Sequence, residues 1–145
     1  MLDVNGAIKL GHSEIVMVSS TKFEIKGIRF STSNKLYGFA FGGPITTNNK
    51  NVLLYTHDGG ANWLVSTFVQ FELSSILQTG CIFGSDYGFV AENDGTIIYS
   101  SDAFMTWKIF STIGNINITD MNVIMSNSKI IITVAYLSSS IYSVK

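Results

Sequence analysis

Apolar and polar residues alternate along this chain in short runs, and a helical period of three to four residues is hardly visible. Two such runs, Asp86–Ala91 and Thr96–Tyr99, are joined through the sequence Glu92-Asn93-Asp94-Gly95. Asn, Asp and Gly tolerate the positive φ that a tight turn requires, so this stretch predicts a β-hairpin. The same order, with a longer connection, occurs in Leu36–Ala40 and Val52–Tyr55. The pattern predicts an all-β protein.

One nine-residue pattern occurs twice, 44 positions apart. We call Tyr55–Trp63 (Tyr-Thr-His-Asp-Gly-Gly-Ala-Asn-Trp) box 1 and Tyr99–Trp107 (Tyr-Ser-Ser-Asp-Ala-Phe-Met-Thr-Trp) box 2. Tyr-Gly-Phe followed by a small residue also recurs, at 37–40 and 87–90. A repeat of this length accommodates four short strands, which is typical of a β-propeller blade.

A third and weaker copy follows the two boxes. Met121–Ile124 and Lys129–Ala135 predict two of its strands, and Ser140–Ser143 matches the strand before box 2, with Lys145 where a third Asp would stand. Glu14–Ser19 is a strand-like run that could supply the missing outer strand of the last blade. We therefore expect an N-terminal segment over 1–24 and a partial propeller of about three blades over 25–145. Three blades do not close a ring comfortably, so completion by oligomerisation is expected.

The box positions have a structural interpretation. A carboxylate at the start of a turn can accept backbone N–H groups two or three residues on, and a nearby hydroxyl can extend that network. The two indoles can then fill the gaps between neighbouring sheets. On this interpretation the structural residues of the boxes are Thr56, Asp58, Gly60, Trp63, Ser100, Asp102, Thr106 and Trp107.

The pattern resembles the Asp-box (BNR) repeat, Ser/Thr-x-Asp-x-Gly-x-Thr-Trp, of sialidases, sortilin-type receptors and photosystem II assembly factors. Box 1 departs from it at Asn62, which replaces Thr, and box 2 departs at Phe104, which replaces Gly and is expected to alter the turn. The resemblance implies a β-propeller in which the box is a structural turn away from the binding face.

Composition narrows the class of partner. Hydrophobic residues make up 46% of the chain and charged residues 13%, so the core is easily supplied and the surface is rich in hydroxyl and amide groups. A net charge of −1 without a basic run lacks the electrostatic footprint of a nucleic-acid binder. No apolar run approaches the ~18 residues that span a bilayer. The single cysteine, Cys81, lies in an apolar stretch and is expected to be a buried hydrophobe.

Known catalytic chemistries are poorly represented. Sialidases, which the repeat resembles, hold their substrate carboxylate with three arginines, whereas this chain has only Arg29. Two histidines and one cysteine do not make a zinc cluster, and His57 is expected to face solvent. Gly42-Gly43-Pro44 is predicted to be a turn, without the Lys-Ser/Thr of a phosphate loop. We expect no enzyme activity, metal or cofactor, and interpret four carboxylates as solvated turn charges: Glu72, Asp86, Glu92 and Asp94.

Two segments bear on binding. The connection Gly43–Asn51 exceeds the repeat's own length, and its polar residues could hydrogen-bond a sugar, unless it is a tolerated surface insertion. Those residues are Thr46, Asn48, Asn49 and Lys50. Leu2–Gly11 resembles the Leu-x-Val-x-Gly-x-Ile segments of trimeric bacteriophage tail fibres.

These features predict a non-catalytic interaction or structural module. We expect a bacteriophage virion or tail-fibre component that contacts a cell-surface glycan or a neighbouring virion protein, in a virion or extracellular location. Otherwise the location is cytoplasmic. One alternative is an assembly factor that binds a protein partner, and another is a glycoside-processing enzyme.

Overall fold

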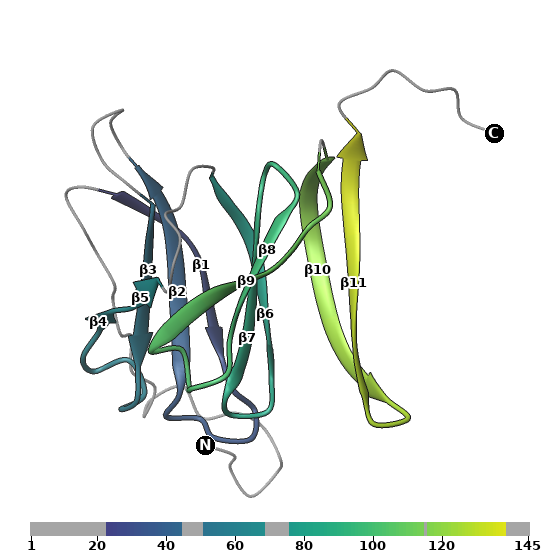
Figure 1. The fold of residues 1–145 in the computed structure, drawn as a ribbon. Coiled ribbons are helices and arrows are strands. Elements are labelled where there is room, and N and C mark those ends of the chain that lie inside the picture. Colours follow the sequence, from purple (N-terminus) through teal and green to yellow (C-terminus); the bar gives the residue numbers. More distant parts are fainter. Residues whose placement is uncertain (1–22, 45–50, 69–75, 115, 139–145) are drawn as a thin grey trace, which may run out of the picture.

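The structure, a computed structural model, describes residues 23–44, 51–68, 76–114 and 116–138 (Figure 1). Within these ranges the chain forms strands, turns and loops and no helix, which confirms the predicted all-β class. The eleven strands are β1 (Phe23–Phe30), β2 (Gly38–Pro44), β3 (Val52–Thr56), β4 (Leu64–Val65), β5 (Thr67–Phe68), β6 (Leu77–Phe83), β7 (Tyr87–Glu92), β8 (Thr96–Ser100), β9 (Thr106–Thr112), β10 (Ile116–Ser126) and β11 (Lys129–Ser138).

The strands form three sheets. Sheet 1 has the order β1-β2-β3-β4, sheet 2 the order β5-β9-β8-β7-β6, and sheet 3 is the hairpin β10-β11. Figure 1 shows them side by side, with sheet 3 at the right. The first strands of the three units are neighbours, because β6 contacts β1 on one side and β10 on the other. Sheets 1 and 2 each contain the same unit, an antiparallel meander of four strands: β1-β2-β3-β4 in sheet 1 and β6-β7-β8-β9 in sheet 2. In each unit the box joins the third strand to the fourth.

The hairpins β1-β2, β6-β7 and β10-β11 carry the same irregularity. The register shifts by one residue between Ile25 and Gly27 in β1, between Leu77 and Thr79 in β6, and between Ile118 and Asp120 in β10. A β-bulge inverts the alternation of side chains at that point. Sequence reasoning did not identify β1 as a strand, because the bulge breaks its period of two.

The glycines of β2 lie in the sheet and not in a turn. Gly42 pairs with Ile25 on one side and with Val52 on the other, so the prediction of a turn at Gly42-Gly43-Pro44 is wrong. A Cβ at position 42 would clash with the backbone carbonyl of Glu24, which explains why glycine stands there. The predicted hairpin of β7 and β8 does form, and Gly95 in its turn has a φ of 92°.

The core has three parts. The first lies between sheets 1 and 2 and comprises Phe39, Phe41, Leu53, Leu77, Val90, Ile98, Phe104 and Trp107. The second lies between sheets 2 and 3 and comprises Cys81, Phe89, Ala91, Ile97, Ile118, Met121 and Val123. The third covers the opposite face of sheet 1 and comprises Ala40, Val52 and Leu54, with Ile25 and Trp63 packed against them. Successive sheets thus stack face to face through their alternating apolar positions.

Several predicted features lie outside the described residues. These are the N-terminal segment with its strand-like run Glu14–Ser19 and most of the long β2–β3 connection, and the third strand of the last repeat at Ser140–Ser143. The two strands predicted before it, in Met121–Ile124 and Lys129–Ala135, are parts of β10 and β11.

Candidate functional site

Box 1 closes on its own carboxylate. The hydroxyl of Thr56 donates a 2.8 Å hydrogen bond to Asp58 Oδ1 and accepts the backbone N–H of Gly60 at 3.0 Å. Asp58 Oδ1 also accepts the backbone N–H of Asn62 at 2.9 Å, and Asp58 Oδ2 accepts the Asn62 side-chain amide at 2.7 Å. The carboxylate thus reaches Asn62, four residues along the chain and one residue beyond the predicted range of two or three.

Box 2 repeats this network position for position. Ser100 Oγ donates to Asp102 Oδ1 at 2.8 Å and accepts the backbone N–H of Phe104 at 3.0 Å. Thr106 donates its backbone N–H to Asp102 Oδ1 at 2.9 Å and its hydroxyl to Asp102 Oδ2 at 2.5 Å. Asn62 therefore replaces Thr without loss of the hydrogen bond, because its side-chain amide donates to Asp58 Oδ2 as the hydroxyl of Thr106 donates to Asp102 Oδ2.

The networks lower the pKa of both carboxyl groups. The side-chain and backbone hydrogen bonds from Asn62, with that from Thr56, hold the pKa of Asp58 at about 2. Burial raises the pKa of Asp102, but the hydrogen bonds from Thr106 and Ser100 outweigh it and lower the pKa overall. Hydrogen bonds to an ionised carboxylate favour its charged form, so both groups are anions that fix a turn.

The two turns share a left-handed backbone although their residues differ. Gly59 and Gly60 have φ values of 74° and 93°, and the corresponding Ala103 and Phe104 have 58° and 75°. The prediction that Phe104 alters the turn is wrong. A non-glycine residue in this region costs about 1–3 kcal/mol and persists where its surroundings hold it there. Phe104 is held because its ring is fully buried in the core.

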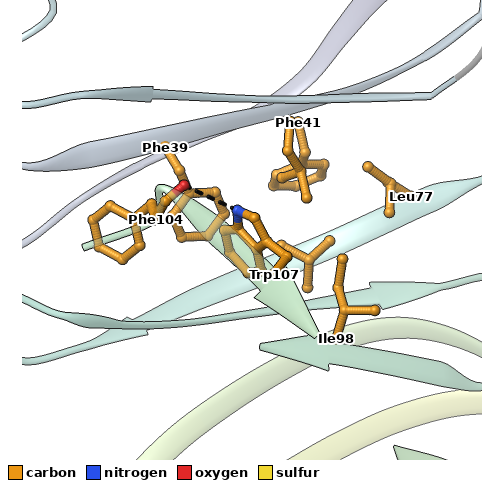
Figure 2. Close-up of a cluster of buried hydrophobic side chains, with 8 residues drawn as sticks. Phe39, Phe41, Leu77, Ile98, Phe104 and Trp107 are labelled. Carbon is orange, nitrogen blue, oxygen red and sulfur yellow. Dashed lines mark hydrogen bonds between the residues drawn. The ribbon is translucent and has the colours of Figure 1, made fainter. Parts of the chain in front are cut away.

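The tryptophans of the two boxes have different surroundings. Trp107 is fully buried between sheets 1 and 2, with its ring centroid 5.1 Å from that of Phe39, and its Nε1 donates to the Phe104 carbonyl at 3.1 Å (Figure 2). Trp63 is half-buried on the outward face of sheet 1, where it meets Phe30 edge to face at 6.0 Å. Its buried Nε1 has no hydrogen-bond acceptor in the part of the chain that the structure describes. The gap-filling role predicted for both indoles is thus observed for Trp107.

Three main-chain oxygens of box 2 accept hydrogen bonds from box 1 and from residues 66–67, which follow β4. His57 Nε2 lies 2.8 Å from the carbonyl of Ala103, so that nitrogen carries the proton. Ser66 Oγ donates to the Phe104 carbonyl at 2.7 Å, and the backbone N–H of Thr67 donates to the Met105 carbonyl at 2.9 Å. The last bond belongs to the region where β5 pairs in parallel with β9. Hydrogen bonds as well as apolar packing therefore join sheets 1 and 2.

His57 is not the solvent-facing residue that the sequence predicted. Its ring stacks on Tyr37 at a centroid distance of 4.3 Å and lies 5.0 Å from Tyr55. The imidazole is partly buried between these rings and the turn of box 2.

Arg29 and Cys81 both serve the junctions between sheets. Arg29 Nε donates to the Gly80 carbonyl of β6 at 2.7 Å, and the guanidinium lies 5.5 Å from the ring centre of Phe41. Cys81 is buried between sheets 2 and 3, as predicted, and burial raises the pKa of its thiol to about 11.

The candidate carboxylates in the described residues lie at both ends of β7. Asp86 is exposed in the turn before β7, whereas Glu92 ends that strand and Asp94 lies in the turn beyond it. The six-residue strand β7 separates Asp86 from Glu92 by roughly 20 Å. This is twice the carboxylate separation of about 9.5 Å that glycoside hydrolysis allows. Glu92 is 2% exposed, so its description as a solvated turn charge is wrong. Glu72 lies outside the described residues.

Three further kinds of site are a metal centre, a membrane-spanning helix and the predicted sugar-binding loop. Within the described ranges, no group of three or more His, Cys, Asp or Glu side chains could hold a metal ion. The described chain also contains no helix long and apolar enough to cross a bilayer. Thr46, Asn48, Asn49 and Lys50, the proposed sugar-binding residues, fall in the range 45–50 that the structure leaves undescribed.

An apolar pocket that sequence reasoning missed opens between sheets 2 and 3. It has a volume of about 320 Å³ and is lined by Tyr87, Phe89, Tyr99, Ile109, Phe110 and Ile130. The available signal was Ile109-Phe110, two consecutive large apolar residues in a strand that otherwise alternates. A bulge in β9 at Phe110 brings both of them to the pocket.

Comparison with known proteins gives no family for this chain. No protein-family model matches the sequence, and neither the curated proteins nor the solved structures contain a significant match.

Proposed function

We propose that this chain is a non-catalytic interaction module, an arc of a β-propeller that associates with further sheets. The observation that carries the proposal is the side-by-side repetition of one structural unit. The same box network occurs on sheets 1 and 2, and the first strands β1, β6 and β10 are successive neighbours. Radial repetition of this kind is the principle of a propeller.

The free faces of the arc support association. On the outward face of sheet 1, Ile28 is 41% exposed, Phe30 is 40% exposed and Val65 is 69% exposed. On sheet 3, Ile124 pairs with Ile131, and both are more than 40% exposed. Within the described residues no further sheet covers either face. Contiguous exposed apolar surface is typical of interaction sites.

A second copy of the chain, or a neighbouring assembly protein, suits these faces better than a glycan, which requires many hydrogen-bonding groups. The residues proposed for a glycan contact and the fibre-like segment 2–11 lie outside the described ranges. The proposal of a virion appendage is supported by the resemblance of that segment, by the low content of charged residues and by the incomplete number of blades.

The proposal is tested by measuring the molar mass in solution by size-exclusion chromatography with light scattering. We expect a concentration-dependent increase above 15.9 kDa. Val65→Glu places a charge on the outward face and should abolish association. Leu64→Glu is the matched control, because Leu64 is 57% exposed on the opposite face of the same strand. A monodisperse wild-type monomer at high concentration, with no protein captured from its natural source, contradicts the proposal.

A further inference from the structure

The pocket between sheets 2 and 3 has a structural template within the same molecule. Three of its walls are Tyr87, Phe89 and Tyr99 of sheet 2. The repeat relates them to Tyr37, Phe39 and Tyr55, which occupy the same positions in sheet 1. The pocket in the second gap is therefore bounded by the same three aromatic positions as a region of the first gap.

The first gap shows what these aromatic walls receive. Phe39 lies 5.1 Å from the ring centroids of both Phe104 and Trp107, and Tyr37 and Tyr55 pack against the same cluster. Phe104 and Trp107 are both 0% exposed. Phe104 comes from the turn of box 2 and Trp107 from the extended strand β9 that follows it, so two rings of one short segment fill the space (Figure 2).

In the second gap no such rings are present among the described residues. Phe89 meets Tyr99 and Phe110 of its own sheet at centroid distances of 6.4 and 5.8 Å, and sheet 3 contributes Ile130. Ile109 and Phe110 are 50% and 53% exposed beside the cavity. Position 110 also corresponds to Ser66, whose hydroxyl binds box 2 in the first gap. An apolar ring replaces a hydrogen-bond donor there, which makes this pocket more apolar than its template.

We infer that this pocket receives a tryptophan side chain on an extended strand of a second polypeptide chain. The pocket continues the buried interface of sheets 2 and 3, since Phe89 and Tyr99 belong to both. Its side chains offer two phenol hydroxyls and no charge, so an aromatic side chain fits it better than a sugar or an anion. The inference rests on the proposed function, because it takes the second gap as a repeat of the first.

The probe is a fluorescein-labelled synthetic peptide of residues 100–112, which carries the rings that fill the first gap. Its affinity for the full chain is measured by fluorescence anisotropy. A control peptide with Phe104→Ala and Trp107→Ala should bind at least tenfold more weakly. Equal binding of the two peptides, or saturation by neither, overturns the inference.

Protein variants locate the binding. Ile130→Trp fills the pocket from its rim and should weaken peptide binding at least tenfold, whereas Leu137→Trp, on the same strand but away from the pocket, should leave it unchanged. Phe110→Ser should weaken binding as well, and circular dichroism verifies that each variant is folded. Peptide binding unaffected by Ile130→Trp overturns the inference. Self-association that persists without peptide binding overturns the inference and leaves the proposed function standing. Peptide binding by a strictly monomeric chain supports the inference and contradicts the proposed self-association.

Discussion

The imidazole of His57, in box 1, donates a hydrogen bond to the main-chain carbonyl of Ala103, in box 2, at 2.8 Å. One box turn therefore contacts the next directly. The same side chain stacks on Tyr37 at 4.3 Å, so the bond is shielded by an aromatic ring. This contact links the two turns through a single side chain.

Replacement of His57 should destabilise the fold. His57→Ala removes the hydrogen bond to Ala103 and the stacking on Tyr37, and we expect a loss of about 1–3 kcal/mol in the free energy of unfolding. Ser101 is the matched control, since it is the exposed counterpart in box 2. Ser101→Ala should change stability by less than about 0.5 kcal/mol. Urea denaturation measures both, and equal effects of the two variants contradict the structural role of His57.

The left-handed residues of box 2 predict opposite effects of two glycine substitutions. Ala103→Gly relieves a φ of 58° at the loss of one methyl group, and we expect a gain of about 1 kcal/mol in stability. Phe104→Gly relieves a φ of 75° but removes a fully buried ring, and a loss of about 3 kcal/mol is expected.

Thermal unfolding of both glycine variants measures these changes. If Ala103→Gly destabilises the protein as much as Phe104→Gly does, backbone strain is not the dominant factor in this turn.

The carboxylates of the boxes predict a loss of stability in acid. Asp58 and Asp102 both have a pKa below the ordinary value of 3.8 in the folded protein. The unfolded chain then binds more protons in this range, so their contribution is complete above about pH 5. It is lost as the pH falls from 3.8 through about 2, the pKa of Asp58. The melting temperature measured from pH 6 to pH 2 should fall most steeply in that window.

Variants separate the two turns in this experiment. Asp58→Asn should flatten the acid dependence, because it removes the titrating group, whereas Asn62→Thr should preserve it, since Thr106 donates the same bond in box 2. An unchanged slope in Asp58→Asn would falsify the assignment.

The thiol of Cys81 should be unreactive in the folded protein. The residue is 8% exposed and its pKa is raised to about 11, so both access and thiolate content are low at neutral pH. We expect labelling by an aromatic disulfide reagent at pH 7.5 to be at least a hundredfold slower in buffer than in 8 M urea. Rapid labelling in buffer would show that sheets 2 and 3 separate in solution.

The sequence was most informative where two signals coincided. Thr56 and Ser100 occupy equivalent positions of a repeat, and both lie in sequences rich in turn-forming residues. The hydroxyl of each accepts a backbone N–H four residues further along the chain. It was least informative where geometry depends on a neighbouring sheet. His57 and Glu92 are polar residues in turn-like sequences, and only the packing of other strands determines their burial. Ile109-Phe110 alone could not predict the pocket, because its walls come from two sheets.

The bulge shared by the three first hairpins has a consequence for the shape of neighbouring strands. Such an irregularity disrupts the ladder between strands, and it occurs once in the first hairpin of each unit, beside Ile25, Leu77 and Ile118. A bulge bends its strand and increases the local right-handed twist. Because β6 contacts both β1 and β10, the three neighbouring first strands each carry such a bend.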